Sequence, residues 1–218
     1  MKIGYAAALA LACVAGAQTA SADDGVYLRL DTGWSFSRDA GKDLDDDVGS
    51  SAIVGGGVGY KYKWLRGDVT LAYRGGYDID STYTYAALGE TRFKGDVSSF
   101  AAMANVYADL TKYGRFTPYV GGGIGVSRNK VGDVDISAAS GTGTLDGDTK
   151  TSFAWQLSLG TGIEVAPAWT VDVGYRYIDL GTAKSGTTVT SGSVSRDGSA
   201  QEGDLRAHEL ILSARYQF

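Results

Sequence analysis

The sequence has little of three residue types that usually carry fold or chemistry: one cysteine, two prolines and one histidine among 218 residues. A single cysteine, Cys13, excludes an intramolecular disulfide framework. Past the first 22 residues, no stretch approaches the roughly 18 consecutive apolar residues of a membrane-spanning helix. Glycine and tyrosine are abundant instead, with 32 and 14 residues. Proline is excluded from central strands and tyrosine favours them, so the composition indicates a β protein.

The first 22 residues predict a cleaved export signal. Lys2 supplies a positive charge, residues 6–16 are small or apolar, and Ala20-Ser21-Ala22 has the small-x-small pattern of a cleavage site. The alternative is a lipoprotein that is lipidated on Cys13, but it would cut the apolar run very short. We therefore expect residues 1–22 to be removed, which leaves an exported chain of residues 23–218 without cysteine.

Eight segments of the exported chain alternate between polar and apolar residues with a period of two, as strands with two different faces do. They are residues 26–36, 52–62, 66–78, 98–110, 117–127, 152–165, 169–180 and 205–218. In the third segment, the apolar face would carry Val69, Leu71, Tyr73 and Tyr77.

The connections between these segments alternate in length. Three are short, at residues 63–65, 111–116 and 166–168, and four are long and polar, at residues 37–51, 79–96, 128–150 and 181–204. Short turns at one end and long loops at the other are typical of bacterial outer-membrane barrels. The fold class expected for residues 23–218 is therefore all-β, an eight-stranded antiparallel transmembrane up-and-down β-barrel.

The charged residues of the strands all fall on the polar face, six basic against six acidic. This balance predicts an interior charge network made of Arg29, Asp31, Lys61, Arg66, Asp68, Arg74, Asp109, Glu164, Asp172, Arg176, Glu209 and Arg215. The opposite face is apolar, and its aromatic residues gather near both ends of the strands, as in the interfacial girdles of a membrane barrel. A soluble sandwich is the alternative, but it gives no reason for these girdles.

Several segments resemble the small outer-membrane β-barrel family, which includes opacity-type surface antigens, the OmpA barrel and porin-family proteins of α-proteobacteria. Residues 117–125, TPYVGGGIG, are similar to a strand motif of that family, and the ending SARYQF at residues 213–218 resembles its C-terminal motif. The resemblance spans essentially the whole exported chain. It implies localisation in the bacterial outer membrane and an assembly signal made of Leu212, Ala214, Tyr216 and Phe218.

The sequence offers no complete catalytic set, so we expect no enzyme activity and no cofactor. His208 is the only histidine, and Leu210 stands where a lipid-hydrolysing barrel would need a nucleophilic serine. Asp43, Asp45, Asp46 and Asp47 could gather a cation, but they lack the spacing of a calcium loop, and no metal site is predicted. The long connections lack basic clusters, so nucleic acid is not an expected partner.

Two functions remain open at this point. The first is a structural and surface-interaction protein of the envelope, whose lumen is filled by the charge network; the alternative is a narrow porin-like channel for small solutes. An eight-stranded barrel is just wide enough for side chains to fill, which favours the first. The expected partners are outer-membrane lipid and lipopolysaccharide, the outer-membrane assembly machinery, and a host or surface ligand at the outer loops. We expect a monomer.

Overall fold

The computed structural model describes residues 24–39, 49–85, 89–138, 141–184, 186–191, 194–197 and 202–218. The expected signal peptide and Asp43, Asp45, Asp46 and Asp47 lie outside these residues. Eight long strands form the wall: β1 (Gly25–Asp39), β2 (Ser50–Tyr62), β3 (Leu65–Tyr85), β4 (Gly89–Asp109), β5 (Phe116–Val131), β8 (Asp148–Ala166), β9 (Trp169–Lys184) and β12 (Glu202–Gln217).

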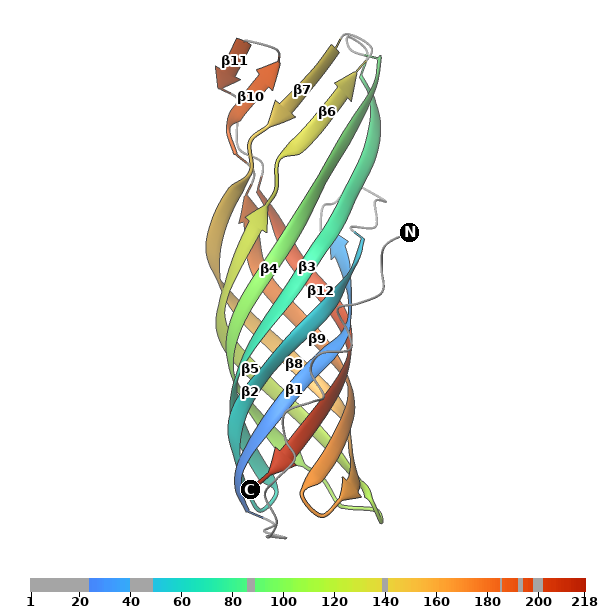
Figure 1. Ribbon diagram of the computed structural model, residues 1–218, viewed down its shortest axis with the longest axis vertical. Coiled ribbons are helices and arrows are strands. Elements are labelled where there is room, and N and C mark those ends of the chain that lie inside the picture. The colour runs from blue at the N-terminus through green and yellow to red at the C-terminus, as the bar shows by residue number, and fades with distance from the viewer. Residues whose placement is uncertain are drawn as a thin grey trace.

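These eight strands close into an antiparallel barrel (Figure 1). Each strand pairs with its neighbour in the chain, β12 pairs with β1, and the pairing of β4 with β5 and of β5 with β8 completes the ring. The eight-stranded barrel predicted from the alternating pattern is confirmed. Within the described residues, no helix is long and apolar enough to cross a membrane.

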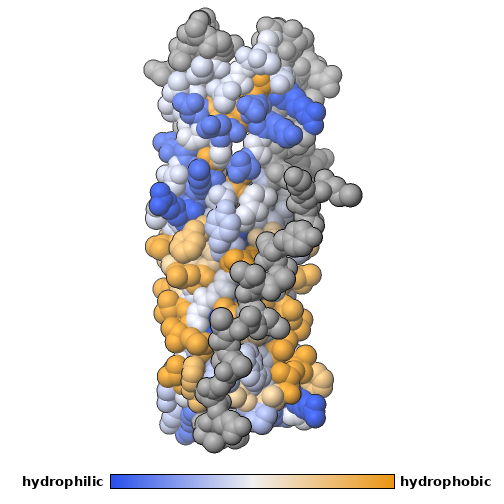
Figure 2. Space-filling model, viewed as in Figure 1, coloured by the Kyte–Doolittle hydropathy of each residue, from blue (hydrophilic) through white to orange (hydrophobic). Residues whose placement is uncertain are grey.

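The two faces of the wall differ as the alternation predicts. Large apolar side chains on the outer face are exposed, including Leu30, Val69, Ile124 and Leu212. In Figure 2 the hydrophobic side chains gather in a band over the lower half of the molecule, with hydrophilic side chains above it. Such a band would be unstable in water and is stable against lipid, where apolar surface needs no protein partner.

The strands extend further than the sequence predicted, which corrects three of the four long loops. Much of residues 79–96, 128–150 and 181–204 is β structure: β3, β4, β5, β8 and β9 continue past the band, and four short strands follow them. These are β6 (Val134–Ala138), β7 (Gly141–Leu145), β10 (Thr188–Ser191) and β11 (Val194–Asp197). Beyond the band, the outer face carries polar residues such as Arg128 and Lys130 in place of apolar ones, so the contrast between the two faces weakens although the backbone ladder continues. For the first connection, residues 40–48 lie outside the described residues.

A β-bulge in β3 corrects the predicted position of Tyr77. The pairing of β3 with β4 shifts between Arg74 and Tyr77, and Gly76 adopts a positive φ of 58°, which glycine tolerates and most residues do not. The bulge inverts the alternation, so Tyr77 points inward and is fully buried, with its hydroxyl 2.6 Å from that of Ser35. The Gly75-Gly76 pair was the sequence signal for this shift.

The opposite end of the barrel is closed by short turns. Lys63 and Trp64 join β2 to β3, Pro167 and Ala168 join β8 to β9, and residues 110–115 join β4 to β5. The C-terminus lies at this end (Figure 1), and the backbone N–H of Lys63 donates to Asp24 near the start of β1. Short turns of outer-membrane barrels face the periplasm, so we assign the end with β6, β7, β10 and β11 to the cell exterior.

Candidate functional site

The interior of the barrel at the level of the apolar band holds most of the charged side chains. Arg29 lies at the centre of one group: its Nε donates to Asp31 at 2.9 Å and its Nη1 donates to Asp68 at 2.9 Å. Asp68 also accepts hydrogen bonds from the hydroxyl of Tyr27 at 2.9 Å and from the side-chain amide of Asn105 at 2.8 Å. The group is buried and spans the lumen between β1, β3 and β4.

A second group is centred on Glu209 of β12, which is completely buried. Its carboxylate accepts a hydrogen bond from Nε of Arg74 at 2.6 Å on one oxygen, and from Nε of Arg176 at 2.5 Å on the other. Arg74 comes from β3, on the far side of β1 and β2 from β12, so this carboxylate connects opposite parts of the wall. Hydrogen bonds to charged groups are the strong ones in such a setting.

Two further ion pairs lie toward the turn end of the lumen. Nε of Arg66 donates to Asp109 at 2.8 Å, and Nη2 of Arg215 donates to Asp172 at 3.2 Å. The guanidinium carbon of Arg66 lies 5.0 Å and 4.9 Å from the ring centres of Tyr107 and Tyr119, within the range of a cation–π contact. These tyrosines fill the width that the inward glycines of β5 leave open.

The structure thus brings together ten of the twelve residues predicted for the interior network, and it corrects the other two. Five arginines face five carboxylates in ion pairs. Glu164 has the inward parity but lies past the end of the lumen, where its exposed side chain pairs with Lys112 at 2.5 Å. Lys61 is half-buried near the same rim, and it makes no ion pair within the described part of the chain.

Above the charged groups, the interior becomes largely apolar, with Ser99, Ser127 and Asn129 buried among the apolar side chains; the sequence did not predict this layer. One cluster of buried residues fills the lumen toward the outer end: Tyr77, Val97, Ala101, Met103, Val131, Ala154, Ile178, Leu180, Leu205 and Ala207. We call it the apolar plug. The sequence does contain a sign of the apolar plug. In β9, the alternate residues that point inward continue beyond Arg176 to Ile178 and Leu180.

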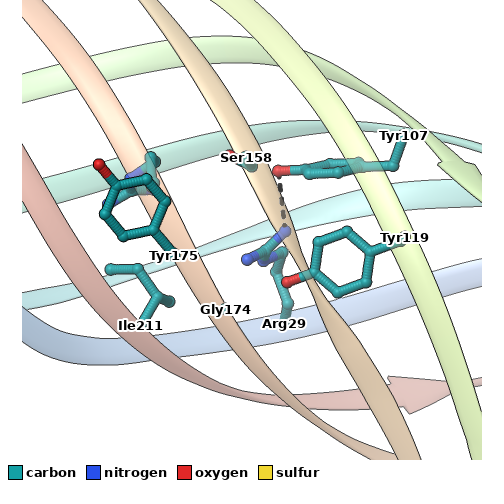
Figure 3. A pocket seen from close by; sticks show the side chains of 8 residues that line it. Arg29, Tyr107, Tyr119, Ser158, Gly174, Tyr175 and Ile211 are labelled. Atoms are coloured by element: carbon teal, nitrogen blue, oxygen red, sulfur yellow. Dashed lines mark hydrogen bonds between the residues drawn. The ribbon is translucent and has the colours of Figure 1, made fainter.

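A small polar cavity separates parts of the charged network (Figure 3). Arg29, Tyr107, Tyr119, Ser158 and Arg176 line it, with Gly174, Tyr175 and Ile211. Nη1 of Arg29 donates to the hydroxyl of Tyr107 at 3.2 Å across its edge. The cavity has a volume of about 10 Å³, which is room for a single water molecule and not for a solute.

His208 lies on the outer face of β12, as its parity predicts, rather than in the lumen. Its Nδ1 is 2.5 Å from the hydroxyl of Tyr175, and its ring packs edge-on against Tyr177 at 5.4 Å. The contacts place it in the aromatic girdle of the outer rim. Among the residues that the structure describes, no group of three or more histidine, cysteine or acidic side chains is arranged to hold a metal ion.

The residues expected to form the assembly signal lie along the outer face at the end of β12. Phe218 follows the last residue of the strand, its backbone N–H donates to the carbonyl of Val26 at 3.0 Å, and its ring packs against Tyr216 at 5.0 Å. Leu212 and Phe218 are exposed on this face, and Ala214 is half-buried between them.

Comparisons with known proteins agree with this architecture. Outer membrane protein PagN of Salmonella typhimurium is 25% identical over the full length of both chains. The Brucella abortus protein BAB2_0314 is 30% identical, with 71% of this chain and 67% of that protein covered. The Rickettsia conorii protein RC1281, whose name describes a candidate adhesin, is 27% identical, with 79% of this chain and 69% of that protein covered.

Two solved structures share the fold. Neisserial surface protein A matches with a TM-score of 0.57 at 17% identity, covering 89% of this chain and 97% of that one. OprG from Pseudomonas aeruginosa matches with a TM-score of 0.54 at 12% identity, covering 91% and 99%. A family model described as the outer membrane protein beta-barrel domain matches residues 5–218. The chain therefore belongs to the outer membrane protein beta-barrel family and is a protein of the bacterial outer membrane.

Proposed function

We propose that this protein is a sealed barrel that contributes to the integrity of the envelope and displays an outer β-sheet for contacts with other surfaces, without enzyme activity. The single observation that carries the proposal is the filling of the lumen by two consecutive layers. A solute that enters from the turn end meets the pairs of Arg66 with Asp109 and of Arg215 with Asp172, and then the charged groups around Arg29 and Glu209. Beyond them it meets the apolar plug.

The chemistry of the two layers argues against conduction. Each buried carboxylate of the charged layer is held by arginine at 2.5–3.2 Å, so opening a path requires breaking several charge-assisted hydrogen bonds at once. In the plug, Leu180, Ile178 and Ala207 have no exposed surface. An ion in an apolar constriction loses its hydration, and such constrictions block flow by dewetting.

The outer strands supply the surface for contacts. Four pairs join β6 to β4, five join β6 to β7, and Val189 and Thr190 join β10 to β7, so the outer connections form one continuous sheet rather than separate loops. Figure 1 shows this sheet projecting from the end opposite the turns. The names of PagN and of RC1281 describe an outer membrane protein and a candidate adhesin, which is in keeping with a contact role.

Conductance and adhesion test the two halves of the proposal separately. Purified protein, refolded and inserted in planar bilayers, should give no steady single-channel conductance. Expression in a non-adherent bacterial host should increase attachment to epithelial cells, and the gain should disappear when residues 134–145 and 188–197 are replaced by short turns. Steady channels in the unmodified protein would instead support the narrow porin-like channel.

A further inference from the structure

The outer face of β5 carries two basic side chains directly above the apolar band. Arg128 and Lys130 follow Val126 at alternate positions, so all three point outward, and all three are exposed. In the register of the barrel wall, Arg128 lies opposite Phe100 of β4, whose ring is exposed to the surroundings of the band. The transition from apolar to basic side chains therefore occurs within one residue pair.

Hydroxyl groups flank both basic side chains on the same face. Arg128 lies opposite Thr151 of β8, and Lys130 lies between Ser98 of β4 and Thr149 of β8. Side chains of paired residues in antiparallel strands have Cβ atoms about 4.5–5.5 Å apart, and alternate residues of one strand are about 7 Å apart. Two cations and three hydroxyls thus share a patch about two residue pairs high and three strands wide.

The two cations have no acidic partner in the wall. Within the described part of the chain, neither Arg128 nor Lys130 lies within 4 Å of a carboxylate. Arg206, on the outer face of β12, differs in this respect, because it pairs with Asp179 and Asp204 at 3.0 Å each. The nearest carboxylate on the outer face of β4 is that of Asp96, one alternate position beyond Ser98. Arg128 and Lys130 are therefore available to an external anion.

From this arrangement we propose that Arg128 and Lys130, with the hydroxyls of Ser98, Thr149 and Thr151, bind the phosphate groups of the glycolipid in the outer leaflet. The glycolipid places its acyl chains against the apolar band, here Val126, Phe100 and neighbouring Phe153, and its phosphates at the boundary above them. Guanidinium and ammonium groups with adjacent hydroxyl donors match phosphate oxygens. The site rests on the membrane placement of the barrel and is independent of the sealed lumen.

Binding of purified bisphosphorylated lipid A to the folded barrel in neutral detergent tests the proposal. The double variant R128Q/K130Q should bind about tenfold more weakly, because charge-assisted hydrogen bonds to phosphate are lost. The matched control K63Q/K112Q removes two charges at the turn end and should bind as the parent does. Dephosphorylated lipid A should bind the parent about as weakly as bisphosphorylated lipid A binds the double variant.

Three outcomes would overturn the proposal: equal binding of bisphosphorylated lipid A to R128Q/K130Q and the parent, equal binding of lipid A with and without phosphates to the parent, or binding of phosphatidylglycerol as tight as that of lipid A. The last would indicate a general attraction to anionic headgroups. Heat modifiability on gels establishes that each variant is folded before binding is measured. If the double variant does not fold, K130Q alone should still show a several-fold loss, because Lys130 is exposed on the outer face and its replacement leaves the buried interior unchanged.

Discussion

Nε of Arg176 lies 2.5 Å from Oε2 of Glu209, whose carboxylate also accepts a hydrogen bond from Arg74 and has no exposed surface. Breaking a buried pair costs more than the pair itself contributes, because the partner that remains is a charge without compensation. A single substitution in a buried pair should therefore give a loss of stability that is large enough to measure.

Arg176→Ala should lower the free energy of unfolding in urea by about 3–5 kcal/mol if the lumen is dry. Lys112→Ala is the control, because Lys112 pairs with Glu164 at the exposed rim, where an ion pair is worth about 0–1 kcal/mol. Losses of about 1 kcal/mol or less for both variants would mean that water screens the interior charges, as in an open pore. Conductance should then change with Arg176→Ala as well.

Two adjacent glycines of β5 allow a matched test of the packing in the lumen. A Cβ atom on Gly123 would lie 2.0 Å from Oδ1 of Asn105, which holds Asp68 and accepts from Gln156, whereas one on Gly122 would lie 3.4 Å from its nearest neighbour. Gly123→Ala should therefore cost about 1–3 kcal/mol through overpacking, and Gly122→Ala much less. Equal urea midpoints for the two variants would show that the lumen has spare room.

Labelling of intact cells tests the orientation of the barrel. Thr187, between β9 and β10, and Lys112, in the turn between β4 and β5, are exposed at opposite ends and can each be replaced by a single cysteine. A membrane-impermeant maleimide should label Thr187→Cys in intact cells and Lys112→Cys only after the outer membrane is permeabilised. The reverse pattern would invert the assigned orientation.

The role of the C-terminal aromatic residue in assembly is tested by comparison with an aromatic residue at the other rim. Phe218 and Phe36 are exposed to similar extents, 51% and 46%, at opposite ends of the band. If Phe218 is part of an assembly signal, Phe218→Ala should reduce the amount of barrel in the outer membrane while refolding into detergent is retained, and Phe36→Ala should not. If both variants lose the same amount of barrel from the outer membrane, Phe218 acts only as an aromatic girdle residue.

The strands and their faces could be predicted from the sequence because lipid and lumen impose opposite preferences on alternate residues. The same alternation hides the register, since shifting a strand by two residues leaves its pattern unchanged. For this reason Glu209, Arg74 and Arg176 could be assigned to the interior but not to one another. The bulge at Gly76 adds a residue to β3 and moves Tyr77 to the other face, which a strict period of two cannot represent.

The apolar plug and the outer sheet escaped prediction for related reasons. Residues such as Ile178 and Leu180 point inward toward the outer end of the lumen, on the face that was predicted to be polar. In β7 and β10, glycine, serine and threonine dominate, so the composition is that of a loop although the backbone is that of a strand. The prediction depends on one apolar face toward lipid and one polar face toward the lumen. In both places the sequence lacks this difference.

The lateral pairing of the outer strands has a mechanical consequence for any partner that grips them. β6 pairs edge to edge with β4, which continues through the membrane band, and β7 pairs with β6 (Figure 1). A pull on this sheet away from the cell loads the hydrogen bonds of the ladder in shear, so that many must yield together. A flexible loop would pass tension to its two ends alone. A partner that grips this sheet would thus pull on β4, a strand that lies in the lipid, through the whole ladder that joins β6 to it.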